Sequence, residues 1–120
     1  MKSSVDLSYN LENGCWYKTG DEVKYTGELT EYGPDGKVVS KTKFNAGKID
    51  GKTYSWHSNG QKKSEINFSY GLRDGLATWW DERGRKKTQC IYKDNRITIA
   101  SSWDGAGNEK SPLVEFRHES

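Results

Sequence analysis

The sequence predicts an all-β protein, an elongated single-layer antiparallel sheet of stacked β-hairpins. Three observations support this fold class. Related segments begin at Tyr32, Trp56 and Trp80, each 24 residues after the one before. Within them, aromatic and β-branched residues alternate with polar ones, which is typical of strands with one buried face. Only 32% of the residues are hydrophobic although the chain has five Trp, seven Tyr and three Phe, and a thin sheet accommodates such a composition.

The repeat divides the 120 residues into a single domain of five parts. We expect an N-terminal cap hairpin at residues 1–26, full repeats at residues 27–50, 51–74 and 75–98, and a degenerate C-terminal cap at residues 99–120. One hairpin buries too little surface to be stable, so successive hairpins must stack into one sheet. The recurring residues are a first aromatic (Tyr32, Trp56, Trp80), a turn glycine (Gly36, Gly60, Gly84) and a second aromatic (Phe44, Phe68, Tyr92).

Each repeat is expected to be a β-hairpin that turns at its shared glycine. If Trp56 and Phe68 face the same side, the loop between their strands holds an odd number of residues, because paired residues share a face. A three-residue loop, a type I turn closed by a left-handed glycine with a bulge, meets this condition. Gly60 adopts the left-handed conformation at little cost. Further glycines, such as Gly47 and Gly51, are expected to join one hairpin to the next.

The two ends carry weaker versions of the pattern, as capping repeats should. At the N-terminal end, Trp16 and Tyr25 are the expected aromatic residues of a shorter hairpin. Pro112 suits an edge strand at the other end, because proline cannot donate a ladder hydrogen bond. The C-terminal echo of the repeat, which carries a one-residue slip, consists of Trp103, Gly107, Val114 and Phe116.

The segment GKTYSWHSNGQKKSEINFSYGLRDG, from Gly51 to Gly75, resembles the MORN repeat and more closely the bacterial variant of the YwqK-type antitoxin family. The segment ENGCWYKTGDEVKYTGEL is similar to the opening of that family, and the resemblance extends from about Leu7 to Phe116. The third repeat departs from it at Asn95 and Ile99, where the family has glycine. The resemblance implies MORN-like hairpin repeats of 24 residues. It implies less about function, since this scaffold is used with many partners.

No arrangement of residues predicts catalysis, so we expect a protein that is not an enzyme, with no catalytic residue, metal or cofactor. His57 is expected at the surface without the nucleophile and carboxylate that a triad needs, and His118 lies in a polar tail. Cys15 and Cys90 lack zinc-site spacing and lie about three hairpins apart, too far for a disulfide, which predicts two free thiols. Acidic residues beside the turn glycines are explained by local backbone hydrogen bonds.

A partner-binding surface is expected where the repeats differ from one another. Trp79 should point away from the inward Trp80, and Ile91 should face outward near it to form a small apolar spot. Exposed aromatic residues of this kind often anchor interfaces. The alternative is that the capping tail or a dimer mate covers the spot. The residues expected to bind a partner are Trp79, Ile91, Lys63, Arg85 and Lys87.

The leading interpretation is a non-enzymatic module that binds another protein. The family resemblance implies an antitoxin or immunity protein that occludes the active site of a toxin-like partner. The alternative is a membrane-associated or self-assembling scaffold that binds anionic lipid through a basic stripe, and the sheet edges also leave a homodimer open.

Charge and targeting signals limit the partner and the location. The 19 basic and 17 acidic residues are interspersed and give a net charge of +2, so a nucleic-acid partner is not expected. The chain shows no signal peptide and no apolar stretch of about 18 residues. This predicts a soluble, cytoplasmic protein and leaves open a secreted or lipid-anchored parent that has been processed.

Overall fold

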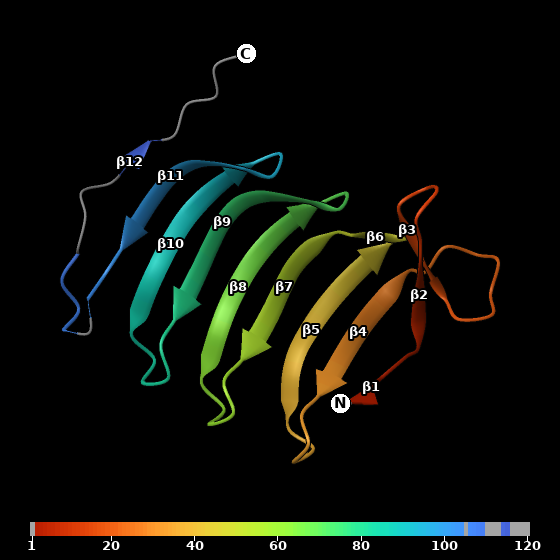
Figure 1. Ribbon diagram of the computed structural model, residues 1–120, viewed down its shortest axis with the longest axis horizontal. Coiled ribbons are helices and arrows are strands. Elements are labelled where there is room, and N and C mark those ends of the chain that lie inside the picture. Colours follow the sequence, from red (N-terminus) through yellow and green to blue (C-terminus); the bar gives the residue numbers. More distant parts are fainter. Residues whose placement is uncertain (1, 105, 110–113, 116–120) are drawn as a thin grey trace.

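The computed structural model describes residues 2–104, 106–109 and 114–115. These residues form a slab with principal extents of 48 × 45 × 17 Å, across which the strands run side by side (Figure 1). The described residues contain strands and turns but no helix, and therefore none that could cross a membrane. The predicted all-β fold, an antiparallel sheet of stacked hairpins, is confirmed.

The strands belong to two sheets. The main sheet has ten strands; its path runs β1-β4-β5-β7-β8-β9-β10-β11-β12, and the short β6 pairs with β5. A separate two-stranded sheet contains β2 (Leu7–Asn10) and β3 (Cys15–Lys18). The strands of the main sheet are β1 (Lys2–Ser3), β4 (Gly27–Tyr32), β5 (Val38–Asn45), β6 (Lys48–Ile49), β7 (Gly51–Trp56), β8 (Lys62–Ser69), β9 (Leu72–Trp80), β10 (Lys86–Lys93), β11 (Arg96–Ser102) and β12 (Val114–Glu115).

The predicted three-residue turn occurs in the hairpin of each full repeat. In the second repeat, His57 N donates to Gln61 O at 2.8 Å and Gly60 N donates to His57 O at 3.0 Å, with Gly60 at φ 90°. Ser58, Asn59 and Gly60 are therefore the loop. The same two hydrogen bonds recur in the turns at residues 33–37, 81–85 and 104–108. The last of these confirms the C-terminal echo with its one-residue slip.

One premise of that turn prediction is wrong: Trp56 and Phe68 do not share a face. Trp56 pairs with Lys62, but Ser55 pairs with Ser64, so Lys63 is an extra residue in β8. Such a bulge shifts all later pairings by one residue. Phe68 therefore pairs with Gly51, on the face opposite Trp56. Equivalent bulges occur at Val39 and Lys87.

Because of the bulges, the first and second aromatic residues of each repeat lie on opposite faces of the sheet. We call them the Phe68 face, which carries the second aromatics Phe44, Phe68 and Tyr92, and the Trp80 face, which carries the first aromatics Tyr32, Trp56 and Trp80. On the Trp80 face the ammonium group of Lys62 lies 5.1 Å from the centre of the Tyr54 ring and 5.7 Å from that of Trp80. Lys86 lies 5.0 Å from the Trp103 ring centre. Cations thus cover aromatic rings on this face.

The turns that link successive hairpins also follow the repeat. The backbone N–H groups of Gly47, Gly71 and Asn95 donate to carbonyls of the preceding unit, the cap for Gly47 and a repeat for the other two, at 2.7–2.8 Å. Asn95 has φ 70°, a left-handed conformation that asparagine adopts more readily than most residues. Its side-chain oxygen also accepts a hydrogen bond from Arg73 N at 2.8 Å. The departure from glycine at this position therefore leaves the linking turn intact.

The N-terminal cap packs on the main sheet through Trp16 and Tyr25, the two aromatic residues expected in its hairpin, although Tyr25 lies outside the strands β2 and β3. The ring centre of Phe44 lies 6.0 Å from that of Trp16 and 5.7 Å from that of Tyr25, both in edge-on contacts. Cys15 and Cys90 are buried, free cysteines. The expectations for Pro112, Phe116 and His118 lie outside the described residues.

Candidate functional site

Two neighbouring pockets meet at Trp79, on β9 (Leu72–Trp80). The first, which we call the basic pocket, has a volume of about 400 Å³. Four of the five predicted partner-binding residues line it: Lys63, Trp79, Arg85 and Lys87. Its other lining residues are His57, Trp80, Asp81, Glu82 and Arg83.

The bulges explain why two lysines flank Trp79. Trp79 pairs with Ser64 of β8 on one side and with Thr88 of β10 on the other. Lys63 and Lys87 are the bulged residues that directly precede these two partners. The local irregularity of each hairpin therefore places one lysine on either side of the tryptophan. Among the described residues, neither lysine has an ion-pair partner.

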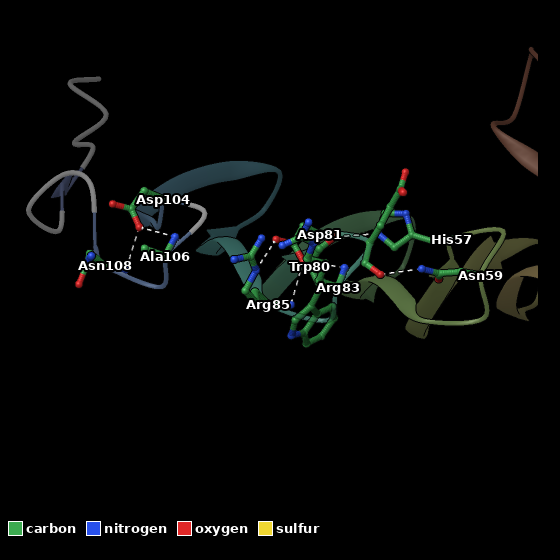
Figure 2. Close-up of polar contacts among 10 residues, drawn as sticks. His57, Asn59, Trp80, Asp81, Arg83, Arg85, Asp104, Ala106 and Asn108 are labelled. Atoms are coloured by element: carbon green, nitrogen blue, oxygen red, sulfur yellow. Dashed lines mark hydrogen bonds and ion pairs between the residues drawn. The ribbon is translucent and has the colours of Figure 1, made fainter.

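The carboxylate of Asp81 accepts hydrogen bonds from residues of its own turn. Its carboxylate accepts hydrogen bonds from Arg83 N and Arg85 N, both at 2.9 Å, and from Arg85 Nε at 3.1 Å (Figure 2). The backbone N–H of Arg85 is the main reason that the pKa of Asp81 lies below its ordinary value. Desolvation opposes the shift, and the Arg83 N–H and the Arg85 charge add to it. Arg85, predicted to contact a partner, is thus partly neutralised within the turn.

His57 and Asn59 hold the turn of the second repeat against the third. His57 Nε2 lies 2.9 Å from the carbonyl oxygen of Trp80, and Asn59 Nδ2 donates to the carbonyl oxygen of Glu82 at 2.6 Å (Figure 2). A carbonyl oxygen only accepts, so Nε2 of His57 carries the proton. His57 is half-buried, less exposed than the sequence suggested. It forms a wall of the basic pocket and joins two repeats.

The second pocket, which we call the apolar pocket, has a volume of about 350 Å³ and lies on the Phe68 face. Trp79 and Lys87 line both pockets. The sequence interpretation missed the rest of this pocket because it treated Cys90 as ordinary repeat core. The pattern along one strand gives no signal of it, because the pocket depends on the pairing of two small residues, Cys90 and Ala100, on neighbouring strands. The remaining lining residues are Thr88, Tyr92 and Ile97.

Burial favours the uncharged forms of two titratable groups in the apolar pocket, Cys90 and Tyr92. Cys90 is 4% exposed. Burial raises the pKa of its thiol, against smaller opposing effects of a hydrogen bond with Tyr92 and the charge of Arg73. Burial likewise raises the pKa of Tyr92, with the neighbouring Cys90 adding to the shift. Both groups are therefore neutral near pH 7, and a thiol is a poor nucleophile.

Ile91 lies apart from the other predicted partner-binding residues. It pairs with Leu76, whereas Trp79 pairs with Thr88, and the alternation along β9 and β10 places Ile91 and Trp79 on opposite faces. The predicted apolar spot formed by both residues is therefore wrong. Ile91 is 40% exposed and Leu76 45% exposed, both on the Trp80 face.

Neither pocket offers a metal site. In the part of the chain that the structure describes, no group of three or more His, Cys, Asp or Glu side chains could hold a metal ion. Two of the acidic residues that were expected beside turn glycines, Asp35 and Asp81, cap their own turns. Asp35 Oδ1, for example, accepts a hydrogen bond from Lys37 N at 3.0 Å, and Asp104 Oδ1 accepts one from Asn108 N at 3.0 Å.

Comparison with known proteins identifies the repeat. The profile of the MORN repeat variant family matches residues 25–46 and 49–70. No curated protein and no solved structure matches the chain significantly. The matched segments start one 24-residue period apart and end before the third repeat, which holds Trp79 and Lys87. MORN repeats are generally modules that bind proteins or lipids. Residues 25–46 and 49–70 are therefore repeats of the MORN variant type.

Proposed function

We propose that this chain is a non-enzymatic binding module that docks another protein at the two pockets around Trp79. The observation that carries the proposal is the position of this tryptophan, which lines both an apolar pocket and a pocket rich in basic side chains. Tryptophan and arginine are enriched among residues that dominate binding energy. In the other repeats the position of Trp79 is occupied by Glu31 and Ser55.

The more specific form of the proposal is an antitoxin or immunity protein. The resemblance to the YwqK-type antitoxin family supports it. In that role the face around Trp79 covers the active site of a toxin-like protein, so inhibition is steric and electrostatic. The module itself performs no chemistry. The raised pKa of Cys90 and the engagement of Asp81 in its own turn both agree with a purely binding role.

A lipid-binding basic stripe is less well supported than a protein-binding site. Lys62 forms an ion pair with Glu65 at 3.6 Å and also covers aromatic rings. Lys86 covers Trp103. Lysines engaged in this way are less available to anionic headgroups, which contribute about 1 kcal/mol for each basic residue near the surface.

The test is affinity capture from the native host, with wild-type protein and Trp79→Ser as baits. The substitution places at position 79 the residue that the second repeat holds there, so it is compatible with the hairpin. We expect the wild type to retain one partner that mass spectrometry identifies, and the variant to lose it. The purified pair should then form a one-to-one complex by light scattering. Equal recovery by both baits would remove Trp79 from the interface, and recovery of lipid alone would favour the scaffold.

A further inference from the structure

Resting on the proposed function, we propose that the two pockets form one bipartite site for a short acidic segment of the partner. The segment places an apolar side chain in the apolar pocket and one or more carboxylates in the basic pocket. Trp79 is the wall between the two subsites. The partner chemistry is therefore defined: an aliphatic or aromatic residue close in sequence to aspartate or glutamate.

The basic pocket and the apolar pocket adjoin each other. Trp79 and Lys87 line both of them, so a ligand that fills one pocket meets the other without leaving the protein surface. The apolar pocket, at about 350 Å³, lies near the lower limit of small-ligand sites, which is roughly 300 Å³. It therefore suits a single side chain rather than a large apolar surface.

Cationic side chains outnumber carboxylates in the lining of the basic pocket. Four cationic side chains line the basic pocket, against two carboxylates. Of these, Asp81 already binds Arg85. Glu82 is exposed, and the ammonium groups of Lys63 and Lys87 have no ion-pair partner within the described ranges. The pocket thus carries an excess of positive charge that an anionic ligand would balance. The cationic residues are Lys63, Arg83, Arg85 and Lys87.

Differences among the three repeats limit the chain to one such bipartite site. The second repeat keeps a lysine at the bulge, Lys63, but has Ser55 in place of Trp79 and Ile66 in place of Cys90. The first repeat has Val39 at the bulge. Only the third repeat combines the tryptophan, the small residue and the lysine. One acidic segment is therefore expected to bind each chain.

The experiment selects ligands from a phage library of random nine-residue peptides against purified wild-type protein. We expect enrichment of peptides that combine one apolar position with adjacent acidic positions. Synthetic versions of the enriched peptides are then titrated, with tryptophan fluorescence as the readout and a fitted stoichiometry of one. Circular dichroism and the melting temperature confirm that each variant is folded.

Two sets of variants separate the subsites. Lys63→Glu combined with Lys87→Glu should weaken the acidic peptides at least tenfold and favour peptides with lysine at the acidic positions. Ala100→Leu, which fills the apolar pocket, should abolish the preference for the apolar residue while retaining that for acid. Lys52→Glu is the control, since this exposed charge on β7 (Gly51–Trp56) lines neither pocket. It should change affinity less than twofold.

The outcomes are distinguishable from failure of the proposed function. Enriched peptides without acidic residues, no enrichment, or equal weakening by Lys52→Glu would each overturn the bipartite site. If the captured partner is lost by Trp79→Ser but retained by the double charge reversal, protein binding stands and the acidic segment is wrong. A concentration-dependent dimer in sedimentation velocity that Trp79→Ser abolishes would show that a second copy fills the pockets, and would also overturn it.

Discussion

Gly47 lies at a contact between the N-terminal cap and the sheet that leaves no room for a side chain. A Cβ added at this position would lie 2.8 Å from Cys15 Cβ, 3.2 Å from Trp16 O and 3.3 Å from Lys24 Cβ, and the residue has φ 83°. Gly71 occupies the same position one repeat later, with φ 85°, but its added Cβ would meet only Lys48 Cδ at 3.4 Å. We therefore compare Gly47→Ala with Gly71→Ala.

Both variants should lose unfolding free energy through strain in the left-handed backbone. Only Gly47→Ala should lose more through overpacking. Placing an alanine in the left-handed conformation costs about 1–2 kcal/mol. At Gly71 the flexible end of Lys48 can move away, so the backbone term is the whole expected loss of unfolding free energy. At Gly47 a Cβ and a backbone oxygen must shift, which adds about 1–3 kcal/mol of overpacking. The expected loss for Gly47→Ala is therefore about 2–5 kcal/mol.

Equilibrium unfolding in urea, followed by tryptophan fluorescence, measures both losses. Gly36→Ala serves as a second reference, because its turn has φ 81° and nothing lies within 4 Å of the added Cβ. We expect Gly36→Ala and Gly71→Ala to agree and Gly47→Ala to be less stable than either. Losses for Gly47→Ala and Gly71→Ala within about 0.5 kcal/mol of each other would refute the close approach of the cap to the linking turn.

Three further predictions concern the polar and aromatic contacts. Phe44→Ala, at a residue 5% exposed, should lower the unfolding free energy by about 3–5 kcal/mol, measured in guanidinium chloride. His57→Ala should lower it by about 1 kcal/mol through loss of the hydrogen bond to the Trp80 carbonyl, measured by thermal unfolding. Because the folded-state pKa of Asp81 is lowered, its stabilisation should be present above the unfolded value near 3.8 and disappear as pH falls through the folded value. The stability difference between wild type and Asp81→Ala should therefore shrink between pH 5 and strongly acidic pH; a difference independent of pH would contradict the role of the carboxylate charge.

The period, the hairpins and the turns could be predicted because they depend on local features. The turn glycines need a left-handed conformation, and Gly60 has it at φ 90°. The bulges could not be predicted in the same way. The three-residue loop was predicted correctly but for a wrong reason, because Trp56 and Phe68 were expected on one face and lie on opposite faces. An extra residue such as Lys63 cannot be recognised among neighbouring polar residues in the sequence. It nevertheless moves every later residue of the strand to the opposite face of the sheet.

The candidate site was predicted in part for a similar reason. Trp79 and Lys87 were found because they differ from the equivalent residues of another repeat, a comparison that needs no knowledge of the register. Ile91 was grouped with them by assuming a register, and the observed pairing places it on the other face. The apolar pocket was missed because it depends on space between strands: Cys90 pairs with Ala100, and the pattern along one strand does not report what lies opposite.

The recurring bulge connects the architecture to the proposed binding role. All three hairpins have the bulge, and its occupant is Val39 in the first repeat and lysine in the other two. The sheet therefore requires an extra residue at this position but not a charge. The charge can vary while the backbone stays the same, so the fold does not require a lysine beside Trp79, and the proposed binding site gives that lysine a role. The fold does not require Trp79 either, since Ser55 at the equivalent position of the second repeat pairs with Ser64 as Trp79 pairs with Thr88.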